Sequence, residues 1–284
     1  MTAIAVVAGK AAPGATTVAN ALTLAFPQPV LLVDADPAGG DVVPGLLPGR
    51  ASTDTGLLSW LVATRHLAAI DATALLPQHA LSLPEAGDAW VLAGLQQPSQ
   101  AGLLASGGWS RLATTVERCG PVLGRTVIVD IGRLSESSGW PVVDACDLVL
   151  LVVRPTARSV QGASAAVQLL RRRLGDLDRV RLVVCGAGPY TPDQVAASLG
   201  FERADRVDRI PADPRAAASL VDGSAATVFG LTRTRLVRAA AQLADRLVVE
   251  ASTSTSTADL PSTPQATPGT PGTPGTQTTQ GSGS

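Results

Sequence analysis

A glycine-containing loop lies between an apolar run and a helix-forming segment near the N-terminus. Its sequence is Gly9-Lys10-Ala11-Ala12-Pro13-Gly14-Ala15-Thr16-Thr17. It matches the phosphate-binding pattern G-x-x-x-x-G-K-S/T at every position except Ala15, which stands where the pattern has lysine. Glycines at both ends let backbone N–H groups and the next helix N-terminus converge on phosphate oxygens, while the Thr16 hydroxyl can ligate Mg²⁺. The loop therefore predicts a phosphate site that lacks one of its usual cations.

Two apolar segments end in aspartate, which is the residue that a nucleotide–Mg²⁺ site needs at the same sheet edge. Val30 to Val33 runs into Asp34 and Asp36, and Thr126 to Val129 runs into Asp130. A strand-end aspartate taken alone is also a common helix cap or turn former. Two such segments after a loop of this kind favour a metal and phosphate site.

The loop resembles the deviant Walker A motif K-G-G-x-G-K-T-T of the MinD/ParA family, with Lys10 at the signature lysine. Lys10 is also the only lysine among the 22 Lys and Arg residues. The resemblance implies ATP and Mg²⁺ as cofactors and a homodimer in which Lys10 reaches the phosphates across the interface. It implies that the residues of the loop from Gly9 to Thr17 bind the nucleotide.

The aspartate segments extend the resemblance, because the family has a V-D-x-D-P segment and a Walker B strand. The resemblance implies that Asp36 assists hydrolysis together with Lys10. It implies that Asp34 and Asp130 hold Mg²⁺ with Thr16. Further similarity through Leu148 to Pro155, Val180 to Gly186 and Ile210 to Asp213 spreads it over nearly all of residues 1–250.

The loop departs from the family at four positions. Ala11 and Ala12 replace glycines, Pro13 has no N–H to donate, and Ala15 removes the second lysine. Losing a charge-assisted contact weakens phosphate binding about 10-fold to 100-fold. Removing a donor from a developing negative charge slows a reaction about 100-fold to 1000-fold. We expect ATP binding with weak or lost hydrolysis; for the loop alone, an ordinary turn of small residues is the alternative.

Continuous apolar runs alternate with helix-forming segments, which predicts an α/β fold with a mostly parallel, doubly wound sheet and helices on both faces. With the resemblance, this is the SIMIBI type of P-loop NTPase. The first turn lacks G-x-G-x-x-G, which disfavours a dinucleotide-binding dehydrogenase. The expected strands are Ala3 to Ala8, Val30 to Val33, Trp90 to Leu92, Thr126 to Val129, Leu148 to Val153 and Val180 to Val184. The expected helices are Thr16 to Phe26, Thr55 to His66, Ser110 to Cys119, Ser159 to Leu174, Thr191 to Leu199, Asp213 to Val221 and Thr232 to Val249.

Composition divides the chain into two parts. Residues 1–250 are expected to form one nucleotide-binding domain, and residues 251–284, with 16 Ser or Thr, 5 Pro, 5 Gly and the single charge Asp259, a disordered tail. The longest apolar run, Leu148 to Val153, is far shorter than the roughly 20 residues of a membrane span, and no signal peptide is expected. Three separated cysteines and two distant histidines predict neither disulfides nor a metal cluster, which fits the cytoplasm.

The resemblance leaves three functions open. We expect a nucleotide-dependent dimer that positions a cellular machine; the alternatives are a TadZ/CpaE-like scaffold for pilus or secretion machinery and a ParA-like DNA-partitioning ATPase. A protein partner fits the low charge of 16%, while the net charge of −1 gives no overall attraction to nucleic acid. A solvated helix end is the favoured interpretation of the basic cluster Arg171, Arg172, Arg173, Arg179 and Arg181. The last helix is expected to pack on the sheet rather than to anchor the chain in a membrane.

Overall fold

An eight-stranded sheet forms the centre of the protein in the computed structural model, which describes residues 2–10, 14–39, 42–50, 52, 54–83, 86–223, 228–258 and 281. The strand order is β3-β4-β2-β5-β1-β6-β7-β8. Neighbouring strands are parallel, except that β3 pairs antiparallel with β4 at one edge. The strands are β1 (Ala3–Ala8), β2 (Val30–Asp34), β3 (Leu81–Leu83), β4 (Ala89–Leu92), β5 (Thr126–Arg133), β6 (Leu148–Val153), β7 (Val180–Cys185) and β8 (Val207–Ile210).

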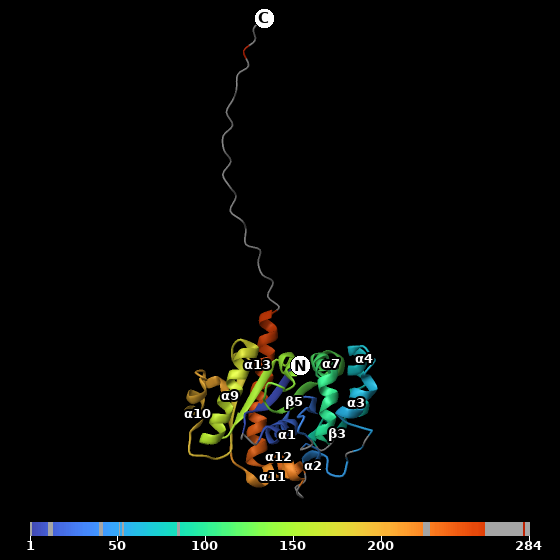
Figure 1. The fold of residues 1–284 in the computed structure, drawn as a ribbon. Helices are drawn as coiled ribbons and strands as arrows, with labels where there is room; N and C mark the ends of the chain where they lie inside the picture. The colour runs from blue at the N-terminus through green and yellow to red at the C-terminus, as the bar shows by residue number, and fades with distance from the viewer. Residues whose placement is uncertain are drawn as a thin grey trace.

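Helices cover both faces of this sheet (Figure 1). The helices are α1 (Ala15–Ala25), α2 (Val42–Leu46), α3 (Leu57–Thr64), α4 (Ala69–Ala74), α5 (Leu76–His79), α6 (Ala101–Leu103), α7 (Trp109–Leu123), α8 (Trp140–Ala145), α9 (Ala157–Leu174), α10 (Pro192–Leu199), α11 (Pro214–Asp222), α12 (Val228–Thr232) and α13 (Arg235–Ala258). Short turns of other helix types are η2 (Pro98–Gln100), η3 (Leu104–Gly108) and η4 (Ala204–Arg206). The predicted doubly wound α/β architecture is confirmed.

Two apolar clusters fill the two faces, because successive strand residues point to opposite sides of a sheet. On one face Ile4, Val6 and Ala8 of β1 pack with residues of α1, α11 and α13. On the other, Ala3, Ala5 and Val7 pack with residues of α3, α7, α8, α9 and α10. Figure 1 shows α2, α11 and α12 grouped at the end of the molecule away from the point where α13 leaves it.

The predicted strands and helices all appear, with boundaries that shift by a few residues except at the end of α13, which was predicted at Val249 and lies at Ala258. β5 is longer than predicted, because it continues through Asp130 to Arg133. No element was predicted at β3 or at α2, α4, α5, α6, α8 and α12, and β8 was indicated only by the similarity to the family that begins at Ile210. α13 runs to Ala258, eight residues past the expected domain end at 250. The tail predicted to be disordered otherwise lies, apart from residue 281, outside the described residues.

The last helix packs on the sheet, as predicted, through Leu236, Val237, Ala240, Leu243 and Leu247, all of which are buried. Within the part of the chain that the structure describes, no helix combines the length and the apolar character needed to cross a bilayer.

Side chains of the predicted basic cluster form ion pairs and hydrogen bonds with other residues of the protein. Arg172 pairs with Glu136 at 2.6 Å and Arg173 with Asp144 at 2.7 Å. Arg179 donates to the backbone carbonyl oxygens of Asp144 and Cys146. Because these guanidinium groups already have partners, the cluster gives no support to a DNA-binding surface.

Arg181, the last member of that cluster, lies in a buried ion-pair network at the amino ends of β7 and β8. Its Nε donates to Asp208 Oδ2 at 2.9 Å and its Nη1 donates to Glu250 Oε2 at 2.7 Å. Arg246 pairs with Asp208 at 2.7 Å, and Arg206 pairs with Glu250. Since Arg246 and Glu250 belong to α13, the network fastens the end of this helix to the sheet.

Candidate functional site

The loop between β1 and α1 is closed at both ends by glycines that admit no side chain. Gly14 has a φ of 136°, which L side chains rarely adopt, and it is the N-cap of α1. A β-carbon on Gly9 would lie 2.5 Å from the carbonyl oxygen of Gly162, in α9, and one on Gly162 would collide with the carbonyl oxygen of Lys10. The start of the loop is therefore in backbone contact with α9.

Ala11, Ala12 and Pro13 lie outside the described residues, so their predicted role stays a prediction. The rest of the loop leads into the first turn of α1. Ala15 is 6% exposed and belongs to the core, whereas Thr16 and Thr17 are half-buried. The backbone at Lys10 lies against α9, and its side chain is exposed. Among the described residues no side chain caps the start of α1, which suits a helix N-terminus that binds an anion.

Asp34 and Asp130 are brought together by the sheet. They are register partners in the parallel strands β2 and β5, and they are 1% and 0% exposed. A β-carbon on Gly94 would lie 2.5 Å from the carboxyl carbon of Asp34, so only glycine fits beside it. Asp130 Oδ1 accepts a hydrogen bond from the Gly132 N–H at 3.0 Å. The predicted pair of carboxylates thus stands side by side at the carboxyl edge of the sheet.

Asp36 reaches the same edge through a turn and a bulge. Its Oδ1 accepts a hydrogen bond from the Ala38 N–H at 2.8 Å, which fixes the side chain locally. The register between β1 and β5 shifts after Val6, and Gly132 of β5 has a φ of 69°. A β-carbon on Gly132 would collide with the Asp36 carboxylate, so this carboxylate lies against the backbone just past Asp130.

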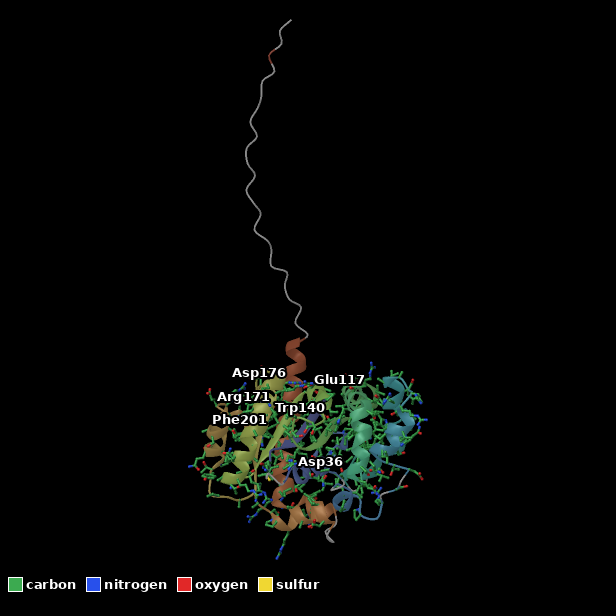
Figure 2. The ribbon with its side chains drawn as sticks, viewed as in Figure 1. Asp36, Glu117, Trp140, Arg171, Asp176 and Phe201 are labelled. Atoms are coloured by element: carbon green, nitrogen blue, oxygen red, sulfur yellow. The ribbon has the colours of Figure 1, made fainter. Side chains whose placement is uncertain are left out.

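Figure 2 shows Asp36 below Glu117, Asp176 and the C-terminal end of α13. Because β1, β2 and β5 are parallel, their carboxyl ends share one edge with the loop that follows β1, and the ion-pair network of Arg181 lies at the amino edge. In an open α/β sheet, ligands bind beyond the carboxyl ends of the strands where the strand order reverses. β1 lies at such a point, between β5 and β6.

The floor of the loop contains residues that the sequence analysis did not single out. A β-carbon on Gly14 would lie 3.1 Å from Cys185 Sγ and 3.8 Å from Val152 Cγ1. Burial raises the pKa of the Cys185 thiol, and the positive charge of Arg154 lowers it. The sequence feature that could have identified Arg154 is its position directly after the apolar run of β6. The contact of Gly162 with Lys10 had no local signal, because it joins residues far apart in the sequence.

The donor set fits Mg²⁺ with a phosphorylated ligand. No group of three or more His, Cys, Asp or Glu that could hold a metal by itself occurs in the described ranges. Mg²⁺ is usually bound by one or two carboxylates together with substrate phosphates and water, and the neighbouring Asp34 and Asp130 fit this pattern. A loop end that only glycine fits, followed by a helix N-terminus, suits the phosphates.

No protein-family model matches the sequence, and no curated protein matches it significantly. Solved structures match the fold. A ParA family ATPase from Chlorobium tepidum has 18% identity and a TM-score of 0.67, covering 86% of this chain and 98% of its own. MinD with Mg-ADP from Pyrococcus horikoshii has 16% identity and a TM-score of 0.67, covering 88% and 97%. MinD in the MinC:MinD complex of Aquifex aeolicus has 18% identity and a TM-score of 0.64, covering 88% and 96%. The chain thus has the P-loop NTPase fold of ParA and MinD ATPases.

Proposed function

We propose that this chain, which shares the fold of the ParA and MinD ATPases, is a nucleotide-dependent dimerising switch with weak or lost ATPase activity. ATP with Mg²⁺ is its ligand, and a protein assembly is its partner. The observation that carries the proposal is the carboxyl edge of the sheet, which the glycine-limited loop after β1 shares with the register-paired Asp34 and Asp130. The MinD neighbour solved with Mg-ADP supports the choice of ligand.

Each residue has a role in this proposal. The backbone from Gly9 to Thr17 holds the phosphates, and Thr16 with Asp34 and Asp130 holds Mg²⁺, which neutralises phosphate charge. Asp36 orients the attacking water, because its carboxylate is fixed beside the same edge without lying in the strand.

Slow hydrolysis follows from Ala15. Charge that develops on the transferred phosphoryl group requires cations held in place beforehand, and the first turn of α1 presents a buried methyl group there. Binding is less affected than turnover, because the loop backbone and Lys10 remain. A state that binds ATP and hydrolyses it slowly is suited to holding a partner at a position.

The exposed side chain of Lys10 supports a dimer. Its backbone is fixed against α9 while its side chain projects outward, so it is suited to contact a nucleotide bound by a second subunit. The MinC:MinD complex among the structural neighbours supports a protein as the further partner.

Light scattering with and without Mg-ATP tests the dimer, and a phosphate-release assay on the same samples tests turnover. We expect Mg-ATP to double the mass of the wild-type protein and to leave Lys10→Ala monomeric. Turnover should be about 100-fold to 1000-fold slower in the wild type than in Ala15→Lys. Equal turnover of wild type and Ala15→Lys at a rate typical of ATPases would contradict the proposal of reduced hydrolysis.

The burial of Ala15 favours a second candidate, a TadZ/CpaE-like scaffold that keeps the fold and the dimer surface without using nucleotide. It predicts a dimer of the same mass in the absence of nucleotide, unaffected by Lys10→Ala. A nucleotide-dependent mass excludes this scaffold.

A further inference from the structure

A phosphate site whose loop has Ala15 in place of the second lysine needs another cation nearby, because a triphosphate carries several negative charges. The order of the strands shows which residues lie near the loop and can supply this cation. β6 lies beside β1, and β7 lies beside β6. The residue that follows β6 is Arg154, whose side chain is exposed. The inference below rests on the proposed nucleotide site.

The sheet places Arg154 next to the apolar cluster that contains α1. Val153 of β6 is the register partner of Val184 of β7, so Arg154 is level with Cys185 one step further along. Leu148, Leu150 and Val152 belong to the apolar cluster that contains α1, as does Cys185. Arg154 follows this row directly after β6 ends, and its charge acts on Cys185, which belongs to the same cluster.

The same row forms the floor of the loop. Val152 and Cys185 are the side chains that a β-carbon on Gly14 would approach. Arg154 lies two residues past Val152, which is a rise of about 7 Å along the strand direction. Its side chain therefore starts beyond the floor, at the level of the loop itself. The Arg154 side chain is exposed there.

Electrostatics agrees with this geometry. The charge of Arg154 lowers the pKa of the Cys185 thiol against the larger effect of burial, so the guanidinium acts directly on the floor beneath Gly14. The backbone at Arg154 is also fixed. Its N–H donates to Ser159 Oγ at 2.9 Å, and its carbonyl oxygen accepts from the Thr156 N–H at 2.8 Å. These two hydrogen bonds fix the backbone of Arg154 at the start of α9.

We propose that Arg154 supplies the phosphate-binding cation that Ala15 does not, so that the site holds a triphosphate with an arginine from the end of β6 in place of a lysine from α1. An arginine serves this purpose because its planar guanidinium binds two phosphate oxygens at once.

Calorimetric titration with Mg-ATP tests the assignment in the full chain. We expect Arg154→Ala and Arg154→Gln to bind Mg-ATP about 10-fold to 100-fold more weakly than the wild type, and Arg154→Lys to retain most of the affinity. Arg158→Ala is the matched control, because Arg158 is also exposed and lies in the first turn of α9. The control should bind as the wild type does, and all four variants should melt near the wild-type temperature.

Restoring the lysine separates a phosphate contact from a structural effect. We expect Ala15→Lys to recover Mg-ATP binding in the Arg154→Ala background. Failure of this rescue, or equal affinity of wild type and Arg154→Ala, overturns the assignment and leaves the proposed nucleotide site standing. Absence of Mg-ATP binding by the wild type contradicts the proposed function itself, and the assignment with it.

Discussion

Buried ionisable residues are arranged differently at the two edges of the sheet. At the amino edge Arg181 and Asp208, whose side chains are 6% and 3% exposed, are paired with each other and with Glu250 and Arg246 of α13. At the carboxyl edge two groups of the same sign, Asp34 and Asp130, are buried as register neighbours. Opposite charges in contact stabilise each other. Two carboxylates at neighbouring strand positions instead form a donor pair of the kind that a divalent cation binds.

This difference distinguishes residues that stabilise the fold, at the amino edge, from residues that can bind a ligand, at the carboxyl edge. At the amino edge the buried charges form ion pairs with other residues of the same chain. The carboxyl edge combines like charges with glycines that exclude side chains, and such departures from the rules of stable folding are typical of binding sites. A divalent cation would use the two neighbouring carboxylates as ligands.

The largest effect is expected at the amino edge. Arg181→Met leaves Asp208 and Glu250 without their shared partner, which should lower the free energy of unfolding by about 3 kcal/mol and the melting temperature by about 6 to 12 °C. Arg203→Ala is the control, since the pair of Arg203 and Asp205 is 60% and 63% exposed, and should leave the melting temperature unchanged. Equal melting temperatures of Arg181→Met and wild type would show that the network does not hold α13.

A second prediction concerns the contact between α9 and the loop. Gly→Ala inside a helix usually adds about 1 kcal/mol of stability, but Gly162→Ala should subtract about 1 to 3 kcal/mol, because its β-carbon meets the Lys10 carbonyl oxygen. Thermal melting measures the sign directly. Gly102→Ala, which places its β-carbon in open space, is the control and should be neutral or stabilising. Stabilisation by Gly162→Ala would mean that α9 does not press on the loop.

The smallest effect on stability is expected from Asp130→Asn. The amide oxygen can still accept from the Gly132 N–H, and the side chain keeps its size while it loses its negative charge. In the absence of metal the free energy of unfolding should change by less than about 1 kcal/mol. Denaturant unfolding with and without Mg-ATP checks this, and the stabilisation by Mg-ATP should disappear. Stabilisation by Mg-ATP equal to that of the wild type would show that Asp130 does not hold the metal.

Local patterns were enough to predict the elements that carry the site. β1, β2 and β5 are continuous apolar runs buried on both faces, and Asp34 and Asp130 follow from where such runs end. β8 was harder to recognise, because Asp208 and Arg209 interrupt a strand of four residues, and Asp208 is tolerated only through Arg181 and Arg246. These partners lie on β7 and on α13, both distant from Asp208 in the sequence.

The parts of the site that the sequence did not reveal depend on contacts between distant elements. Gly162 looks like an unfavourable residue in a helix until α9 is placed against Lys10. Arg154 looks like a surface residue until the register of β6 and β7 sets it beside Cys185. Both features follow from strand order and register, which are set by the packing of the whole sheet.

Calorimetric titration of the wild-type protein with ATP, in the presence and absence of Mg²⁺, tests most directly whether the carboxyl edge is a nucleotide and metal site. We expect micromolar binding that requires Mg²⁺ and that is lost in Asp130→Asn, although this variant remains folded. Binding of equal strength in Asp130→Asn, or no binding by the wild type, would contradict the assignment of this edge to Mg-ATP.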